Sequence, residues 1–196
     1  MQPELIRAAD AELVLYRQFI APAESARLLA TLREEIHWRQ DRIRLFGREQ
    51  AIPRLQQFQG EPGLRYRYSG LTLDAEPWHP LIEQLRQEIA RVEPSPFNCV
   101  LLNYYRDGDD SMGWHSDDEP ELGPNPVIAS LSLGQARRFA LRHRQDPQHP
   151  KFELTLDDGS LLLMRGRTQH CWQHALPRTR RACGARLNMT LRYIRD

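Results

Sequence analysis

The sequence lacks the features of a membrane protein and of a disulfide-rich secreted protein. It has no apolar run of about 18 residues, so we expect neither a membrane-spanning helix nor contact with a membrane. It does not open with a basic segment that leads into an apolar run, so no secretory signal is expected. Cysteine is scarce, and Cys99, Cys171 and Cys183 lack the spacing of a metal motif. An odd number of cysteines without a disulfide framework favours a reducing compartment, the cytoplasm.

Lysine is almost absent, since Lys151 is accompanied by 26 arginines. Two explanations stay open: a genome that favours arginine codons, or a need for guanidinium groups that bind phosphate and carboxylate in a bidentate manner. The remaining composition is ordinary for a globular protein, with 40% hydrophobic residues, 27% charged residues and a net charge of +1. A length of 196 residues suits one domain with a real core. We therefore predict a single domain over residues 1–196 and a monomer.

Apolar spacing predicts helices near the N-terminus and strands after residue 96. The helices are expected over residues 22–36 and 80–92, each opened by a proline. The strands are expected at residues 97–105, 127–133, 138–144, 152–156, 160–164 and 185–194. Asp157-Asp158-Gly159, between two of these strands, indicates a hairpin turn. The pattern predicts an α+β protein whose strand-rich part, residues 97–196, forms a sandwich or a double-sheet barrel.

The last predicted strand has two contrasting faces. Arg186, Asn188, Thr190 and Arg192 alternate with apolar residues, so they share one face of the strand. Such a polar face is either solvated or lines a ligand pocket. The two arginines lie six positions apart, about 20 Å along an extended strand. They could therefore bracket a small dicarboxylate, one at each end, but could not both clamp one carboxylate.

Two histidines and one aspartate form a candidate metal site. His115 and Asp117 are two positions apart, so both point to one side of an extended segment. With a third ligand they would form the set that holds one face of a non-haem Fe(II) and leaves the other face open, although zinc or manganese could use the same ligands. His174 is the preferred third ligand because it lies between two predicted strands, where a loop would hold it at the mouth of the site. For His170 we prefer an ordinary structural histidine.

Two runs of sequence resemble a known family. The first is Asn103-Tyr-Tyr-Arg-Asp-Gly-Asp-Asp-Ser-Met-Gly-Trp-His-Ser-Asp-Asp-Glu119, and the second extends from His174-Ala-Leu-Pro177 to Arg186-Leu-Asn-Met-Thr-Leu-Arg192. They are similar to the metal-binding segment and the R-x-N-x-T-x-R signature of the AlkB family of Fe(II)/2-oxoglutarate dioxygenases. The resemblance extends over residues 43–194. Pro53-Arg54 and the run Tyr66-Arg-Tyr-Ser-Gly-Leu-Thr-Leu73 resemble most the branch that repairs double-stranded DNA.

The resemblance implies a fold and a set of site residues. The fold is a double-stranded β-helix, or jelly roll, preceded within residues 1–96 by helices and a nucleic-acid recognition lid. His115, Asp117 and His174 are implied as ligands of Fe(II), with 2-oxoglutarate and O2 as co-substrates. Arg186 is implied to pair with the distal carboxylate of 2-oxoglutarate and Arg192 to lie near its metal-side end. Further co-substrate contacts are expected from Asn103, Tyr105 and Asn188.

The resemblance also implies a reaction and a substrate. Oxidative decarboxylation of 2-oxoglutarate to succinate is coupled to hydroxylation of an N-methyl group on a damaged base, which is then lost as formaldehyde. The expected targets are 1-methyladenine and 3-methylcytosine in DNA, duplex as well as single-stranded. Both are cationic and pair poorly, which lowers the free energy needed to flip them out of the helix. RNA or a protein side chain is an alternative substrate, and a non-catalytic nucleic-acid-binding module is an alternative class of protein.

Several side chains are candidates for contact with the nucleic acid. Phe46 is expected to wedge into the base stack from the tip of a basic hairpin, or else to be buried under the lid. Tyr66 and Tyr68 share a face and are expected to stack on or hydrogen-bond the flipped base, unless they only pack. Glu119 is expected either to favour a cationic base or to be a solvated acid. Phosphate contacts are expected from the basic loop before the last strand, at Arg178, Arg180 and Arg181.

Overall fold

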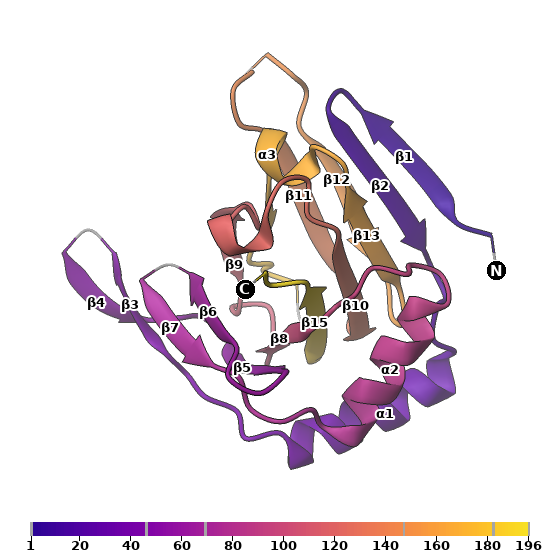
Figure 1. Cartoon of the computed structure of the whole chain (residues 1–196), viewed down its shortest axis with the longest axis vertical. Coiled ribbons are helices and arrows are strands. Elements are labelled where there is room, and N and C mark those ends of the chain that lie inside the picture. The colour runs from indigo at the N-terminus through magenta and orange to yellow at the C-terminus, as the bar shows by residue number, and fades with distance from the viewer. Residues whose placement is uncertain (1, 46, 69, 147, 182, 196) are drawn as a thin grey trace.

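Two antiparallel sheets face each other in the computed structural model, which describes residues 2–45, 47–68, 70–146, 148–181 and 183–195 (Figure 1). The major sheet has seven strands, in the order β1 (Glu4–Ala8), β2 (Ala11–Tyr16), β13 (Leu161–Arg165), β10 (Ile128–Gly134), β15 (Arg186–Arg192), β8 (Cys99–Tyr105) and β5 (Leu55–Gly60). The minor sheet has four strands, in the order β12 (Phe152–Leu156), β11 (Arg137–His143), β14 (Trp172–Leu176) and β9 (Met112–His115). This is the expected jelly-roll architecture.

Helices and hairpins surround the two sheets. Figure 1 shows α1 (Pro22–Glu35) and α2 (Pro80–Ala90) side by side at the base of the molecule, against the major sheet. Two hairpins lie at the left of the view. Their strands are β3 (Arg42–Leu45) with β4 (Arg48–Ala51), and β6 (Arg65–Tyr68) with β7 (Leu71–Asp74). The short elements η1 (Pro120–Leu122) and α3 (Thr168–Cys171) complete the fold. Among the described residues no helix combines the length and the apolar character needed to cross a bilayer.

Each face of the major sheet has its own packing partner. On the helix side, Leu102, Leu131 and Met189 pack with Leu32 of α1 and Ile89 of α2 in one apolar cluster. The opposite face meets the minor sheet, and the apolar cluster between the sheets joins residues of both. Leu187, Met189 and Leu191 of β15 belong to the cluster on the helix side. Because side chains alternate along a strand, the other side chains of β15 point into the space between the two sheets: Arg186, Asn188, Thr190 and Arg192. The polar face of β15 is therefore enclosed between the sheets, and all seven residues of this strand are buried.

The predicted elements are found close to their expected bounds, with two corrections. The Asp157-Asp158-Gly159 turn is not a hairpin, because β12 pairs with β11 whereas β13 pairs with β10 and β2. The turn instead carries the chain from the minor to the major sheet, and glycine suits it because φ of Gly159 is +70°. His174 does not lie in a loop but in β14.

Strands from both parts of the chain build the major sheet. β1, β2 and β5 come from residues before 96, whereas β8, β10, β13 and β15 come from residues after it. β5 pairs with β8, and β2 pairs with β13. The N-terminal part therefore supplies strands to the core as well as helices and projecting hairpins.

Candidate metal centre

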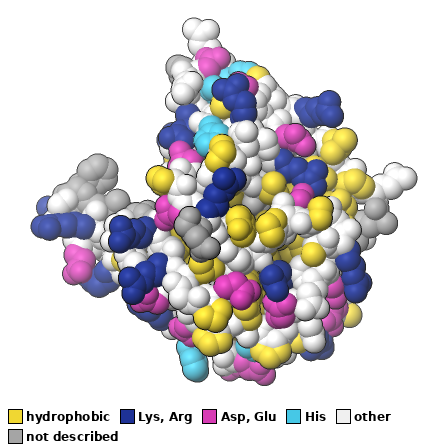
Figure 2. Space-filling model, in the orientation of Figure 1, with side chains coloured by type: hydrophobic (Ala, Val, Ile, Leu, Met, Phe, Trp, Pro, Cys, Tyr) yellow, Lys and Arg dark blue, Asp and Glu magenta, His cyan; other side chains and the backbone are white. Residues whose placement is uncertain are grey.

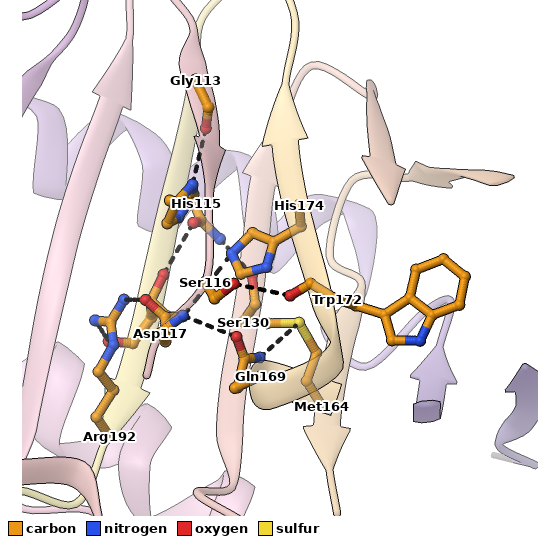
Figure 3. Close-up of polar contacts among 12 residues, drawn as sticks. Gly113, His115, Ser116, Asp117, Ser130, Met164, Gln169, Trp172, His174 and Arg192 are labelled. Atoms are coloured by element: carbon orange, nitrogen blue, oxygen red, sulfur yellow. Dashed lines mark hydrogen bonds and ion pairs between the residues drawn. The ribbon is translucent and has the colours of Figure 1, made fainter. Parts of the chain in front are cut away.

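The two histidines and the aspartate meet between the sheets (Figure 3). His115 ends β9 and stands directly opposite His174 of the neighbouring strand β14, with their ring centroids 4.2 Å apart. His174 Nε2 lies 3.9 Å from Asp117 Oδ2. One donor atom from each of the three residues lies within 4.8 Å of the others. Pairing of the two strands, not a loop, therefore holds the imidazoles next to each other.

The hydrogen bonds around this cluster orient each donor. His115 Nδ1 donates to the carbonyl of Gly113 at 2.8 Å, which leaves Nε2 as the free nitrogen. The backbone N–H of Asp117 donates to Gln169 Oε1 at 2.9 Å, and Arg192 donates to Asp117 Oδ1 at 2.7 Å. Asp117 Oδ2 is buried and accepts no hydrogen bond. A buried carboxylate oxygen without a partner is unfavourable unless a cation occupies the space beside it.

The electrostatic environment keeps the cluster in the protonation states that bind metal. Burial opposes ionisation of Asp117, but Arg192, His174 and His115 outweigh burial and lower its pKa to about 2. Burial and the neighbouring His115 lower the pKa of His174 to about 3, and burial lowers the pKa of His115. At neutral pH the cluster therefore presents two neutral imidazoles and one carboxylate. Together these form the donor set suited to non-haem Fe(II).

A second arginine on β15 has a different environment from Arg192. Arg186 is 2% exposed, and its Nη2 donates to Ser132 Oγ at 2.9 Å. Its Nε and Nη1 are buried without a hydrogen-bond partner. Burial lowers the pKa of Arg186 to about 10. The side chain thus has two free donors and a charge without a carboxylate partner. An anionic ligand would accept hydrogen bonds from these donors and neutralise the charge.

One cavity connects this arginine to the metal donors. It is lined by Asn103, Tyr105, Met112, His115, Asp117, Ser130, Phe139, Met164, His174, Leu176, Arg186, Asn188, Thr190 and Arg192. The five residues implied as co-substrate contacts by the family signature are therefore brought together with the three metal donors. The cavity is narrow, about 30 Å³.

The structure adds polar residues around the two cavities to which the sequence analysis gave no individual role. Ser130 Oγ accepts from Asn188 Nδ2 at 2.9 Å, and Asn188 Oδ1 accepts from Thr190 at 3.1 Å. Arg54 is buried, and its Nε donates to Asn103 Oδ1 at 2.7 Å. Ser130 and Ser132 alternate with apolar residues along β10, so the period-two argument applied to the last strand would have found them.

A larger cavity of about 480 Å³ opens beside the metal donors. Its lining includes Tyr66 and Glu119, which are hydrogen-bonded to each other, and Arg178. Burial and the nearby Asp117 raise the pKa of Glu119 to about 7, and its Oε2 is buried without a hydrogen-bond partner. Tyr66 is 1% exposed, and Arg192 lies over its ring at 5.1 Å.

The other proposed nucleic-acid contacts are not gathered in this cavity. Arg180 and Arg181 are exposed and do not line it, although Arg181 and Arg178 line a neighbouring depression with Arg137 and Arg138. Phe46 lies outside the described residues, and the side chain of Tyr68 is likewise not described.

A second group of metal-type donors is less suited to a metal. Asp10, His143 and Cys171 also bring donor atoms within 4.8 Å of one another. However, His143 Nδ1 accepts backbone N–H bonds at 3.3 and 2.9 Å, so its Nε2 carries the proton and has no lone pair for a metal. Asp10 is already ion-paired with Arg167 at 3.0 Å. His170, as expected, has a structural contact, since its Nε2 accepts from the N–H of Asn125 at 3.0 Å.

Comparisons with known proteins agree with this geometry. The model of the 2OG-Fe(II) oxygenase superfamily matches residues 12–192. The DNA oxidative demethylase ALKBH2 of Mus musculus is 37% identical over 188 residues, which cover 91% of this chain and 79% of that protein. The alpha-ketoglutarate-dependent dioxygenase alkB homolog 3 of Homo sapiens is 38% identical over 191 residues, which cover 92% and 65% respectively. The solved structure of OsALKBH1 superposes with a TM-score of 0.62 over 97% of this chain and 99% of that chain; at 15% identity this likeness concerns the fold alone.

A jelly roll with a His-Asp-His cluster beside a buried arginine defines a non-haem iron oxygenase fold and site. The chain belongs to the 2OG-Fe(II) oxygenase superfamily and, within it, to the AlkB family of dioxygenases. It is therefore an enzyme that uses Fe(II), 2-oxoglutarate and O2.

Proposed function

We propose that this chain is an oxidative demethylase of N-methylated bases in DNA, chiefly 1-methyladenine and 3-methylcytosine. The reaction takes one 2-oxoglutarate and one O2 and releases succinate, carbon dioxide and formaldehyde; the cationic base loses its methyl group and a proton and becomes the neutral, unmethylated base. The observation that carries the proposal is one cavity that joins the His115–Asp117–His174 cluster to the unpartnered donors of Arg186. The relatives named as DNA oxidative demethylases support DNA as the substrate.

In this proposal His115, Asp117 and His174 hold the iron, which supplies the oxidising chemistry when bound. Arg186 binds the distal carboxylate of 2-oxoglutarate through its free Nε and Nη1, and Asn103, Tyr105, Asn188 and Arg192 line the remainder of the co-substrate cavity. Arg192 holds Asp117 with one oxygen toward the arginine and the other toward His174. Enclosure between the two sheets excludes bulk water from the reacting atoms.

The larger cavity is proposed to receive the flipped base. Tyr66 and Glu119 lie in its lining, so a cationic methylated base would meet a hydroxyl and a carboxyl group there. The ionised carboxylate of Glu119 would attract such a base, whereas a neutral, correctly paired base would gain no such attraction. Figure 2 shows basic side chains on the projecting hairpins, and Arg42, Arg44, Arg48, Arg65 and Arg67 are exposed there. In this proposal they contact phosphates of the strand that enters the cavity.

The decisive assay combines the chain with Fe(II), ascorbate, 2-oxoglutarate and oligonucleotides that each carry one defined lesion. Mass spectrometry then reports loss of the methyl group, and succinate is measured in parallel. Asp117→Ala should abolish both products while oligonucleotide binding survives, and exposed Asp109→Ala should retain both. Turnover by Asp117→Ala, or its absence in the unaltered chain on every lesion, would refute the proposal.

DNA, RNA and methylated peptides form three arms of the same assay. Turnover of RNA or peptide in preference to DNA would transfer the proposal to that substrate. Phe46→Ala is expected to reduce repair of duplexes more than repair of single strands, and an equal loss on both would eliminate a role in probing the base stack. A cytoplasmic location and a monomeric state stay predictions.

A further inference from the structure

Trp114 is a tryptophan on the surface immediately before the metal donor His115. Its exposed fraction is 37%, and it is one of the few large hydrophobic residues that are exposed in the described part of the chain. The indole N–H groups of Trp38, Trp78 and Trp172 each donate to a protein acceptor at 2.8–3.2 Å. Within the described residues the indole N–H of Trp114 has no such acceptor. Its side chain is thus not anchored in the way that the other three are.

Arg142 lies against this indole. Its Cζ is 4.4 Å from the ring centroid, the shortest cation–π distance among the described residues. Arg142 Nε and Nη2 both donate to the neutral amide oxygen of Gln173, at 2.9 and 2.8 Å. Arg138 and Arg144, before and after it in the chain, each pair with a carboxylate. Arg142 has no ion pair in the described residues, so its charge is available to an external anion.

The position of this pair relates it to the metal centre. Trp114 lies on β9, an edge strand of the minor sheet, and lines the 480 Å³ cavity together with His115, Tyr66 and Glu119. Because it also reaches solvent, it stands at the rim of that cavity. Arg142 reaches it from β11, across β14, over Gln173. A flexible strand that inserts one residue into the cavity can therefore place the adjoining residue on this part of the rim.

A planar aromatic ring beside an unpaired guanidinium matches the chemistry of a nucleic-acid strand. Bases stack on exposed aromatic side chains irrespective of sequence, and each phosphate next to them accepts hydrogen bonds from arginine. We propose that Trp114 and Arg142 form a subsite for the nucleotide next to the target base: its base stacks on the indole, and its phosphate binds Arg142. This inference rests on the proposed function and adds a second contact to the same substrate.

Binding of a short single-stranded oligonucleotide with one N3-methylcytosine tests the subsite. The Fe(II)- and 2-oxoglutarate-loaded chain is used without oxygen, so that no turnover occurs. Trp114→Ala should raise Kd about tenfold, the effect of one lost base stack, whereas Trp114→Phe should keep most of the affinity. Oligonucleotide should quench the tryptophan fluorescence of the unaltered chain and of Trp78→Phe, but much less that of Trp114→Phe.

An abasic site beside the lesion provides a double-mutant cycle. The abasic site is placed in turn on the 5′ and on the 3′ side of the lesion. On the side that stacks on Trp114 it should raise the Kd of the unaltered chain about tenfold, but it should not raise the Kd of Trp114→Ala. Arg142→Gln should reduce the dependence of log Kd on log salt by about 0.7, the value for one phosphate of a single strand. Arg138→Gln is the matched control, because that arginine is already ion-paired, and its slope should not change.

The outcomes separate this inference from the proposed function. Suppose that the unaltered chain binds and demethylates the oligonucleotide. If Trp114→Ala then binds equally well, only the subsite is refuted. The same holds if the losses of binding free energy caused by Trp114→Ala and by the abasic site are fully additive. Unchanged fluorescence quenching in Trp114→Phe would refute it in the same way. If the unaltered chain neither binds nor demethylates any oligonucleotide, the proposed function fails and the subsite fails with it.

Discussion

Arg186 and Arg192 occupy the same face of the same strand, yet their environments are opposite. Both are almost completely buried, at 2% and 3% exposure. Arg192 donates to Asp117, and this partner outweighs burial and raises its pKa above the ordinary value. Arg186 contacts only neutral hydroxyl groups, those of Ser132 and Tyr105, among the described residues, and burial lowers its pKa. The positive charge at the Arg192 end of the cavity is therefore neutralised by Asp117. The positive charge at the Arg186 end has no carboxylate partner within the described residues and is available to an anionic ligand.

The two environments indicate that one arginine stabilises the fold and that the other binds a ligand. A buried ion pair stabilises little relative to apolar residues, but removing one partner leaves an uncompensated charge. A buried arginine without an anion is already in that unfavourable condition. We therefore expect Arg192 to matter for the stability of the ligand-free chain and Arg186 to matter for the affinity of 2-oxoglutarate.

The largest expected effect comes from Arg192→Met. It leaves the buried carboxylate of Asp117 without its partner, so the free energy of unfolding should fall by about 3–5 kcal/mol. Chemical denaturation of the metal-free chain measures this. Arg138→Met, which breaks only an exposed pair, should change stability by less than about 1 kcal/mol. An equal stability of Arg192→Met and the unaltered chain would show that the ion pair of Arg192 with Asp117 does not stabilise the ligand-free chain.

Arg186→Met should show the reverse behaviour. Affinity for 2-oxoglutarate should fall about a hundredfold, because a carboxylate loses charge-assisted hydrogen bonds in a buried site. The stability of the ligand-free chain should change by no more than about 1 kcal/mol, since an unpaired charge is removed. Calorimetric titration of the Mn(II)-loaded chain measures the affinity. The matched control is Arg137→Met, another buried arginine, whose guanidinium donates to three backbone carbonyls; it should lose stability instead.

Glu119, near the Asp117 end of the cavity, should make the stability of the chain depend on pH. Its pKa of about 7 lies above the ordinary 4.5, so the folded chain disfavours the ionised form, and stability present below pH 4.5 is lost as pH rises through 7. Glu119→Gln cannot ionise and should therefore be more stable than the unaltered metal-free chain by about 3 kcal/mol at pH 8. The gain should shrink below about 1 kcal/mol at pH 5. A gain independent of pH would show that ionisation of Glu119 is not its source.

The smallest effect concerns the thiol opposite Arg192. Cys99 pairs with Arg192 across β8 and β15, is fully buried, and has a pKa raised to about 12 by burial. A disulfide reagent at pH 8 should therefore react rapidly with half-buried Cys183 and with Cys99 only after unfolding. Arg192→Met should accelerate labelling of Cys99, whereas Arg186→Met should not. Equal labelling rates in both variants would mean that the two ends of β15 open together.

The sequence predicted the parts of the site that follow a simple period. Alternation along residues 185–194 placed Arg186 and Arg192 on one face, and the structure encloses that face instead of solvating it. The spacing of His115 and Asp117 placed their side chains together. The family resemblance, not periodicity, indicated Asn103 and Tyr105 as co-substrate contacts, and both line the cavity.

What the sequence missed depends on long-range pairing. β9 has four residues and β14 has five, and both are too short to show a period. Yet the register between them is what brings His174 opposite His115. Similarly, an Asp-Gly turn indicates a positive φ at Gly159 but not which sheet the following strand joins. Arg54 was named only within the family match, because nothing local reveals that it reaches Asn103.

The turn at Gly159 has a consequence beyond the path of the chain. A Cβ at this position would collide with the carbonyl oxygen of Ile20, and the N–H of Gly159 donates to the carbonyl of Ser132 at 2.9 Å. Ser132 is the residue whose hydroxyl holds Arg186. A side chain at position 159 would therefore displace Ser132 and, through it, the guanidinium group of Arg186 that is proposed to bind 2-oxoglutarate. Such a variant would resemble a co-substrate defect in a kinetic screen, although residue 159 does not itself line the co-substrate cavity.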